Sequence, residues 1–193
     1  MSETRQRLAG LLTERSVKLG DFTLASGARS SYYIDARLTT MSAEGQHLVG
    51  RVALGAIRDA GWDPEWVGGL TLGADPVAYA IAHRSFHEGP SIDAFTVRKT
   101  PKDHGTGRQI EGGLPAGARV VLLEDSVTSG GSALKAAEVV VAHGADVLGV
   151  LALVDREEGG RAAIEGAGYP FITVFRAADL VRGAGAVSGT ADA

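Results

Sequence analysis

Residues 119–140, RVVLLEDSVTSGGSALKAAEVV, combine the features that decide the fold. A nearly continuous apolar run predicts a buried strand over 119–124, and the apolar spacing after it predicts a helix over 131–143. Two acids, Glu124 and Asp125, come where the strand is expected to end. Strands followed by helices build parallel sheets, and such sheets bind ligands beyond the carboxyl ends of their strands. The two carboxylates therefore lie where a ligand site is expected.

The same alternation of helices and strands runs through the rest of the chain. Apolar spacing and capping residues predict helices over 4–18, 42–60, 74–85 and 159–167. Runs of apolar and β-branched residues predict strands over 66–72, 91–98, 146–154 and 171–175, and an extended segment over 31–38. The glycine-containing end, 182–193, predicts a frayed tail. The pattern indicates one α/β domain, residues 1–193, with a mostly parallel sheet flanked by helices.

The composition excludes several classes of protein. The net charge of -4 argues against a general nucleic-acid binder, which usually carries a basic surface. The chain has no cysteine, so disulfides and thiolate metal sites are excluded and a cytoplasmic location is expected. The charged N-terminal segment lacks the apolar stretch of a signal peptide, and no apolar run is long enough to cross a membrane. We expect neither a nucleic-acid nor a membrane partner.

The turn after the acids, residues 126–132, has the properties of a phosphate cradle. A strand-to-helix turn leaves unpaired N–H groups at the helix start, where the helix dipole also favours an anion. Gly130 and Gly131 allow close approach of the backbone, and nearby hydroxyls add donors. Ionised carboxylates only accept hydrogen bonds, so the acids suit the hydroxyls of a sugar one step from the phosphate. A ribose 5-phosphate fits; the alternative is an acidic strand end before an ordinary helix.

A long polar segment, residues 99–118, separates two of the predicted strands and has no periodicity. Arg98, Lys99, Lys102 and His104 lie within seven residues at its start. Cations aimed at a departing diphosphate stabilise the charge that develops on it, and a histidine can protonate it. Glycines would let a mobile loop over about 99–114 close like a lid and exclude water. The alternative is a solvated basic loop.

Four stretches resemble one known family. VVLLEDSVTSGGS (120–132) resembles the phosphoribosyl-diphosphate (PRPP) signature of the type I phosphoribosyltransferases. VRKTPKDHGTGRQIEG (97–112) is similar to the mobile catalytic loop of the orotate phosphoribosyltransferases. LASGARSSYYIDAR (24–37) and LVDREEGG (153–160) resemble that family's N-terminal substrate segment and its orotate-binding turn. The resemblance implies a type I phosphoribosyltransferase fold with a small N-terminal hood built partly from residues 1–40.

The resemblance also implies a reaction. The 5-phosphoribosyl group of PRPP is transferred to N1 of orotate, which gives orotidine 5′-monophosphate and diphosphate in pyrimidine (UMP) biosynthesis. Mg²⁺ is expected as cofactor, held mainly by PRPP and water, as magnesium commonly is, with no dedicated protein ligand. The implied assembly is a homodimer with shared active sites, in which the loop reaches into the neighbouring subunit. A phosphoribosyltransferase for another base and a PRPP-sensing regulator on the same fold remain as alternatives.

Site residues follow from the resemblance, position by position. The catalytic candidates are Lys99, Lys102, His104 and Asp125. The residues expected to bind PRPP are Arg98, Lys99, Lys102, His104, Glu124, Asp125, Ser126, Val127, Thr128, Ser129, Gly130, Gly131 and Ser132. The residues expected to bind orotate are Tyr33, Ile34, Thr128 and Arg156.

Two of these orotate positions also have plainer interpretations. The planar fork of Arg156 matches a carboxylate, which is the group that distinguishes orotate from uracil. A surface Asp–Arg pair is the alternative for Arg156. The aromatic face of Tyr33 suits a pyrimidine, and a ring packed inward from a core strand is the alternative.

The chain departs from the family at two positions. Ala25 stands where many members carry a lysine, and LTLGADP (70–76) lacks the lysine that many members have in this turn. The main-chain N–H groups of Gly73 and Ala74, at a predicted helix start, are expected to replace the second lysine in part.

Overall fold

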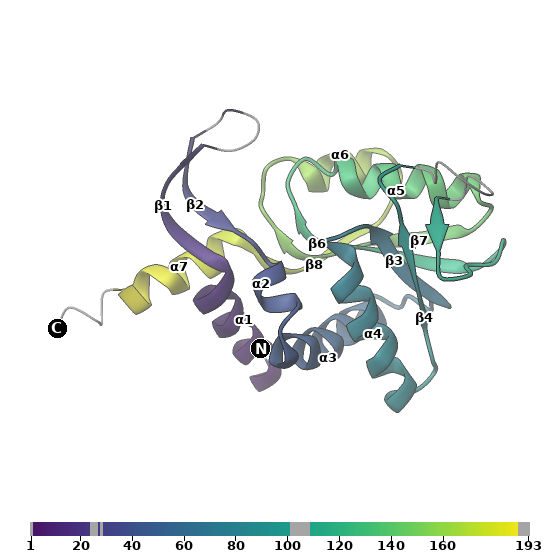
Figure 1. Cartoon of the computed structure of the whole chain (residues 1–193), viewed down its shortest axis with the longest axis horizontal. Helices are drawn as coiled ribbons and strands as arrows, with labels where there is room; N and C mark the ends of the chain where they lie inside the picture. The colour runs from purple at the N-terminus through teal and green to yellow at the C-terminus, as the bar shows by residue number, and fades with distance from the viewer. Residues whose placement is uncertain (1, 24–26, 28, 101–108, 189–193) are drawn as a thin grey trace.

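The centre of the molecule is a six-stranded sheet, seen edge-on in Figure 1. The computed structural model describes residues 2–23, 27, 29–100 and 109–188. The strands lie in the order β5 (Ile110–Glu111), β4 (Asp93–Val97), β3 (Trp66–Leu70), β6 (Arg119–Val127), β7 (Asp146–Asp155) and β8 (Phe171–Arg176). Neighbouring strands from β4 to β8 run parallel, and only the short β5 pairs antiparallel, with β4. The predicted α/β class with a mostly parallel sheet is confirmed.

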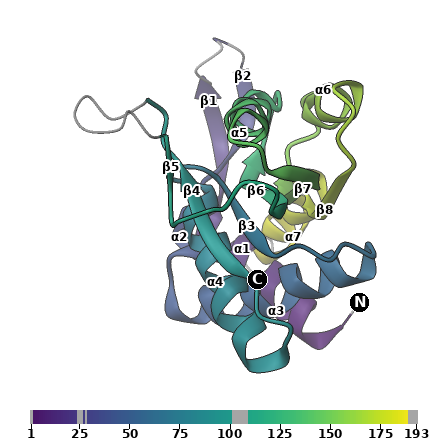
Figure 2. The ribbon, with the colours of Figure 1, turned by 90° about the vertical axis from the view of Figure 1, so that its right-hand side faces the viewer.

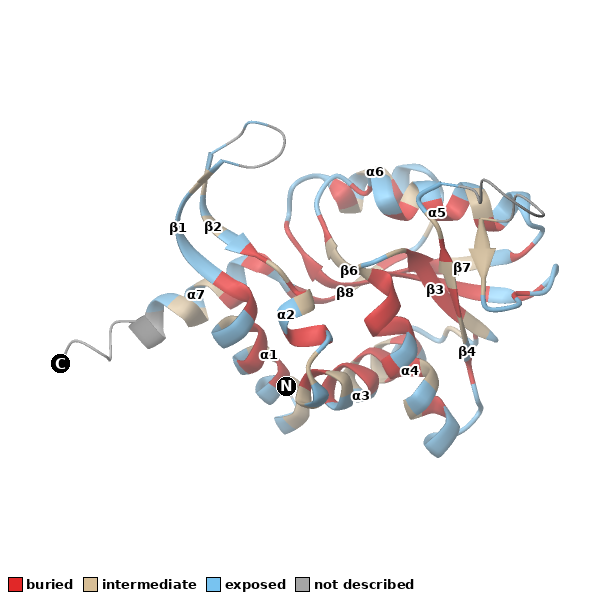
Figure 3. Cartoon of the chain, viewed as in Figure 1, coloured by how far each residue is buried: buried red, intermediate tan, exposed pale blue. Residues whose placement is uncertain are grey.

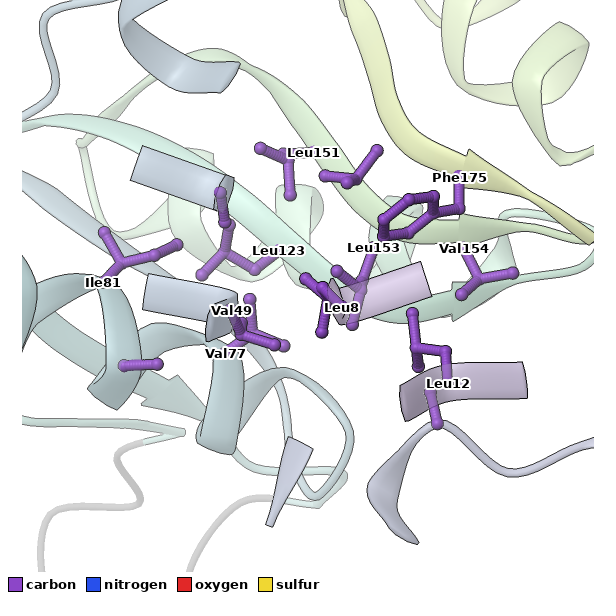
Figure 4. Packing of buried hydrophobic residues seen from close by; sticks show 14 of the residues in the cluster. Leu8, Leu12, Val49, Val77, Ile81, Leu123, Leu151, Leu153, Val154 and Phe175 are labelled. Carbon is purple, nitrogen blue, oxygen red and sulfur yellow. The ribbon is translucent and has the colours of Figure 1, made fainter. Parts of the chain in front are cut away.

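Helices cover both faces of the sheet. One face packs on α1 (Glu3–Ser16), α3 (Ala43–Asp59), α4 (Ala74–Glu88) and α7 (Ala177–Ser188), and the other on α5 (Gly131–Ala142) and α6 (Gly160–Gly166). Side chains alternate across a strand, so β6 sends Val121 and Leu123 into the first core and Val120 and Leu122 into the second. Figure 4 shows Leu123 in the first core with side chains from the surrounding helices. The sheet is buried between these layers (Figure 3).

An antiparallel hairpin stands apart from the main sheet (Figures 1 and 2). It consists of β1 (Val17–Thr23) and β2 (Arg29–Ile34), and the short helix α2 (Arg37–Thr40) follows it. The expectation of an extended chain over 31–38 is therefore right for 31–34 and wrong at 37–38. The first helix ends at Ser16 rather than at residue 18, because the antiparallel pairing of the hairpin already begins at Val17.

Other boundaries also differ from the prediction. The strand predicted to end at residue 124 continues to Val127, because β7 supplies main-chain pairing as far as Asp155, opposite Val127. The predicted frayed tail is wrong for 182–188, which belong to helix α7. That helix is anchored at Leu180, whose buried side chain joins the first core and whose carbonyl accepts a hydrogen bond from Thr13. Residues 189–193 lie outside the described residues.

The capping prediction for the second long helix is confirmed. Ser42 precedes α3, and its hydroxyl accepts a hydrogen bond from the Gly45 N–H at 3.1 Å. Within the described part of the chain, no helix is both long enough and apolar enough to cross a bilayer.

Candidate active site

A pocket of about 240 Å³ lies at the carboxyl edge of the sheet, where β3, β4 and β6 end. Four segments line it: the end of β2 with the residues after it, the end of β3 with the loop after it, the residue two beyond β4, and the last part of β6 with the start of α5. Its lining residues are Tyr33, Ile34, Asp35, Ala36, Arg37, Leu70, Thr71, Leu72, Gly73, Lys99, Glu124, Asp125, Ser126 and Ser132. This is the edge at which open α/β sheets bind their ligands.

Buried polar atoms without partners distinguish this pocket from larger hollows. Glu124 Oε1 and Ser126 Oγ are buried and have no hydrogen-bond partner among the described residues. A hollow of about 900 Å³ between α1 and α7 has no such atom among its lining residues. Buried polar groups are nearly always hydrogen-bonded in folded proteins. The two atoms at the pocket therefore indicate a site that is completed by a polar ligand.

The two acids occupy opposite faces of β6. Glu124 follows the alternation of Leu122 and is 6% exposed, whereas Asp125 follows Leu123 toward the start of α4. A Cβ placed on Gly73 would lie 2.3 Å from Asp125 Oδ1, so the glycine is required for the carboxylate to pack there. The acids were predicted at the end of the strand, but they lie inside β6, which continues to Val127, and their side chains lie on opposite faces of it.

The protonation of the acids reflects their burial. Burial, with a smaller contribution from the charge of Asp125, raises the pKa of Glu124 to about 8. Burial also raises the pKa of Asp125, against the hydrogen bond from the Ser126 N–H at 2.9 Å and the charge of Arg37, which both lower it. Glu124 is therefore mainly neutral at pH 7, while its neighbour is the more readily ionised carboxyl of the pair.

The predicted phosphate cradle forms the turn between β6 and α5. Gly130 has φ 83° and precedes the first residue of α5, which has no side-chain cap. Thr128, Ser129 and Ser132 are exposed, so their hydroxyls are accessible beside the uncapped helix start. The Val127 side chain is instead buried in the core under α5. Any ligand contact at Val127 is thus limited to its main chain.

Arg156 is buried rather than on the surface. Its guanidinium carbon lies 5.2 Å from the ring centroid of Tyr32, and its Nη2 lies 2.9 Å from Glu158 Oε1. That contact is an ion pair without hydrogen-bond geometry, and Nε has no hydrogen-bond partner among the described residues. Asp155 faces Arg161 instead, at 3.7 Å. The alternative of a surface Asp–Arg pair is therefore wrong.

The hairpin presents its aromatic residues on both faces. Tyr33 is 39% exposed and lies 5.8 Å from the ring of Phe22, so its interpretation as an inward core residue is wrong. Ile34 is buried and yet reaches the wall of the pocket. Tyr32, which stacks on Arg156, was not predicted as a site residue. Strand alternation gives the signal that could have found it, because Tyr32 and Ile34 lie on the same face of β2.

Only part of the basic segment can be placed. Lys99 lines the pocket, and its carbonyl accepts a hydrogen bond from Lys135 Nζ at 2.8 Å. Arg98 does not line the pocket and lies 3.5 Å from Glu111 on β5. Lys102 and His104 lie outside the described residues. Of the predicted residues, the structure brings together at the pocket Tyr33, Ile34, Lys99, Glu124, Asp125, Ser126 and Ser132. Outside its lining lie Arg98, Val127, Thr128, Ser129, Gly130, Gly131 and Arg156.

Comparison with known proteins identifies the family, although no protein-family model matches the chain. An orotate phosphoribosyltransferase of Aquifex aeolicus is 47% identical over 180 residues, which cover 92% of this chain and 97% of the relative. The chain belongs to the orotate phosphoribosyltransferase family. A solved Mycobacterium tuberculosis orotate phosphoribosyltransferase in complex with Fe(III) dicitrate has a TM-score of 0.82 and 45% identity over 92% of this chain and 98% of that one. The same enzyme in complex with PRPP has a TM-score of 0.78 and 42% identity, with the same coverage.

Membership in the orotate phosphoribosyltransferase family confirms the predicted type I phosphoribosyltransferase fold. The pocket also contains a residue that was not predicted from the sequence. Arg37 lines the pocket and donates two hydrogen bonds to Asp35, at 2.8 and 3.0 Å, and these lower the pKa of Asp35. The quoted N-terminal segment ends at this arginine, which is the signal that could have found it. Ala25, where many family members carry lysine, lies outside the described residues.

Proposed function

We propose that the chain transfers the 5-phosphoribosyl group of PRPP to N1 of orotate, releasing diphosphate and forming orotidine 5′-monophosphate for pyrimidine synthesis. The observation that carries the proposal is the acid pair at the end of β6, with its unpaired Glu124 Oε1, beside the uncapped start of α5. A phosphate at the helix start and sugar hydroxyls at the acids are the two sets of contacts that a ribose 5-phosphate requires.

Each end of the sugar has matching groups. Residues 126–132 hold the 5-phosphate through main-chain N–H groups and hydroxyls, since a helix start attracts anions. Glu124 and Asp125 hold the ribose hydroxyls. The ionised carboxylate of Asp125 also stabilises the positive charge that the sugar develops as its bond to diphosphate breaks.

Cationic side chains stabilise the departing diphosphate. Lys99 lines the pocket, and Lys102 and His104 follow it in the loop. Arg37 adds a guanidinium to the same pocket. Mg²⁺ fits here as an ion held mainly by diphosphate oxygens and water, because magnesium uses few protein ligands and Asp125 offers a carboxylate nearby. When bound, the ion neutralises part of the charge on the leaving group.

Orotate is placed between the hairpin and the turn after β7. Tyr33 and Ile34 supply an apolar wall, and Thr128 adds a hydroxyl. Arg156 supplies the partner for the orotate carboxylate. Its Nε has no hydrogen-bond partner among the described residues, and its guanidinium carbon lies 5.2 Å from the centroid of the Tyr32 ring.

We further propose a homodimer in which each loop serves the neighbouring site. Support comes from two large exposed apolar side chains seven residues apart on α4, Tyr79 and Phe86, and from the exposed Leu72 in the loop just before this helix. Large exposed apolar side chains in a row are typical of an interface. Mixing inactive Lys99→Ala and Asp125→Asn subunits should restore activity. No recovery after confirmed subunit exchange would exclude shared sites.

The remaining expectations belong to the same proposal: one domain over residues 1–193, a hood formed by the N-terminal segment, no nucleic-acid or membrane partner, and a cytoplasmic location. Cell fractionation tests the location, and a gel-shift assay at physiological salt tests nucleic-acid binding. The decisive experiment for the reaction is an ultraviolet assay of orotate consumption with PRPP and Mg²⁺, with each component omitted in turn. Equal efficiency with uracil would exclude orotate as the specific substrate.

A further inference from the structure

We propose that Asp75 is a positioning residue for PRPP binding, which rests on the proposed function: its carboxylate fixes the loop after β3 against the end of β4. Asp75 lies in the first turn of α4 and is 9% exposed. Its Oδ2 accepts a hydrogen bond from the Thr71 hydroxyl at 2.6 Å, and its Oδ1 accepts one from the Thr96 hydroxyl at 2.8 Å. Both oxygens are thus engaged by donors from two separate elements.

The two donors belong to two walls of the pocket. Thr71 lines the pocket, and its main-chain N–H also donates to the carbonyl of Val97 at the end of β4, at 2.8 Å. Thr96 lies on β4 three residues before Lys99, which lines the facing wall. Asp75 itself does not line the pocket. One carboxylate therefore sets the relative position of the loop 71–73 and of the strand that leads to Lys99.

The position of the loop matters because little space separates it from the acid pair. Gly73 packs against Asp125 so closely that an added Cβ would lie 2.3 Å from Oδ1. A shift of the loop would thus move Asp125, or close the gap that the sugar diphosphate must enter. Misplacement of about 1 Å in an active site can cost about 100-fold in rate. The loop 71–73 has no cationic side chain, so main-chain groups have to supply its contacts to an anion.

A carboxylate at position 75 is unfavourable if its only role is to accept structural hydrogen bonds. It adds negative charge next to a site for an anion, although the start of α4 offsets part of that charge. Each of its two oxygens accepts a hydrogen bond from a hydroxyl group. This arrangement fits a residue that is needed to hold two hydroxyls at once.

The test compares hydroxyl-deleting and hydroxyl-keeping variants. Thr71→Val keeps the shape and removes the donor, whereas Thr71→Ser keeps the donor. We expect Asp75→Ala and Thr71→Val to weaken PRPP binding about 10-fold or more, with the KM for orotate changed less than about twofold, while Thr71→Ser stays near wild type. Calorimetric titration with PRPP and Mg²⁺ measures the affinity without orotate. It therefore tests Asp75 even if wild-type protein fails to consume orotate, which would refute the proposed function instead.

A matched control separates positioning from stability. Ser85 is fully buried on the same helix, at its far end, and its hydroxyl accepts a hydrogen bond from the Ile92 N–H at 2.8 Å. Ser85→Ala should lower the melting temperature and leave the PRPP affinity unchanged. If Thr71→Val and Asp75→Ala, like Ser85→Ala, lower the melting temperature and leave the PRPP affinity unchanged, the positioning role is refuted. If Asp75→Ala does not fold, Asp75→Asn and the two Thr71 variants give the same decision.

Discussion

Replacing Glu124 with glutamine should change how the stability of the protein depends on pH. The folded state raises the pKa of Glu124 from its ordinary value of 4.5 to about 8, mainly by burial. A folded pKa above the unfolded value means that the folded protein holds its proton more tightly. Glu124 therefore costs no stability below about pH 4.5, costs more as the pH rises toward 8, and costs a constant amount above that.

The size of the effect follows from the shift. One pH unit between the two pKa values changes the free energy of unfolding by about 1.36 kcal/mol for a single group. Between about pH 6 and pH 8, allowing for partial ionisation near 8, the wild-type protein should lose about 2 kcal/mol relative to Glu124→Gln. For a chain of this length that difference corresponds to about 4–8 °C in Tm. The glutamine stays neutral throughout, so the variant lacks this loss.

The assay is thermal or urea unfolding of both ligand-free proteins at a fixed protein concentration, at several pH values from about 5 to 9. Only the difference between the two curves is interpreted, since Asp125 and every other titrating group are common to both. Glu138→Gln, on the exposed side of α5, controls for the loss of a surface carboxylate. A Glu124→Gln difference that stays constant from pH 6 to pH 8 would refute the argument from burial.

Three further substitutions test the assigned roles. Asp125→Asn should lower kcat about 100-fold in the orotate assay without changing the circular dichroism spectrum, because the neutral amide cannot stabilise a cationic sugar. Arg156→Ala should weaken orotate binding about 10–100-fold by calorimetry and leave PRPP binding nearly unchanged, since a charged hydrogen bond is removed. Gly73→Ala should weaken PRPP binding about 5–100-fold, because its Cβ collides with Asp125.

Each of these has a clear contrary result. A folded Asp125→Asn protein with wild-type turnover would remove Asp125 from the chemistry. Equal losses of orotate and PRPP affinity in Arg156→Ala would show that the arginine supports the fold rather than recognising a carboxylate. Unchanged PRPP affinity in Gly73→Ala would show that the loop and the acid are free to move apart.

The sequence predicted the sheet well because its strands are buried on both faces. The strands β3, β6 and β7 carry runs of apolar residues that fit no other environment, and each is followed by a helix pattern. The strand β1 was missed for the opposite reason. Its residues Lys18 to Asp21 are all exposed, so it shows neither an apolar run nor a clean alternation. It is held by pairing with β2, which no local pattern reveals.

The parts of the site next to predicted strands could be predicted from the sequence. The parts that depend on contacts between residues distant in sequence could not. Arg98 and Lys99 directly follow β4, and of the two only Lys99 lines the pocket. The burial of Arg156 depends instead on Tyr32, from a hairpin far away in sequence. Likewise, no local sequence pattern indicates that Asp75 accepts a hydrogen bond from Thr96, because the fold brings these two residues together.

The charges that line the pocket explain how an anionic donor can enter it. Arg37 and Lys99 balance Asp35 and Asp125, so the described lining is neutral only while Glu124 keeps its proton. An ionised Glu124 would leave a net negative pocket and would oppose a ligand with several phosphate charges. Burial of this acid thus does more than shape the sugar site. It lets a carboxyl group bond ribose hydroxyls without repelling the diphosphate.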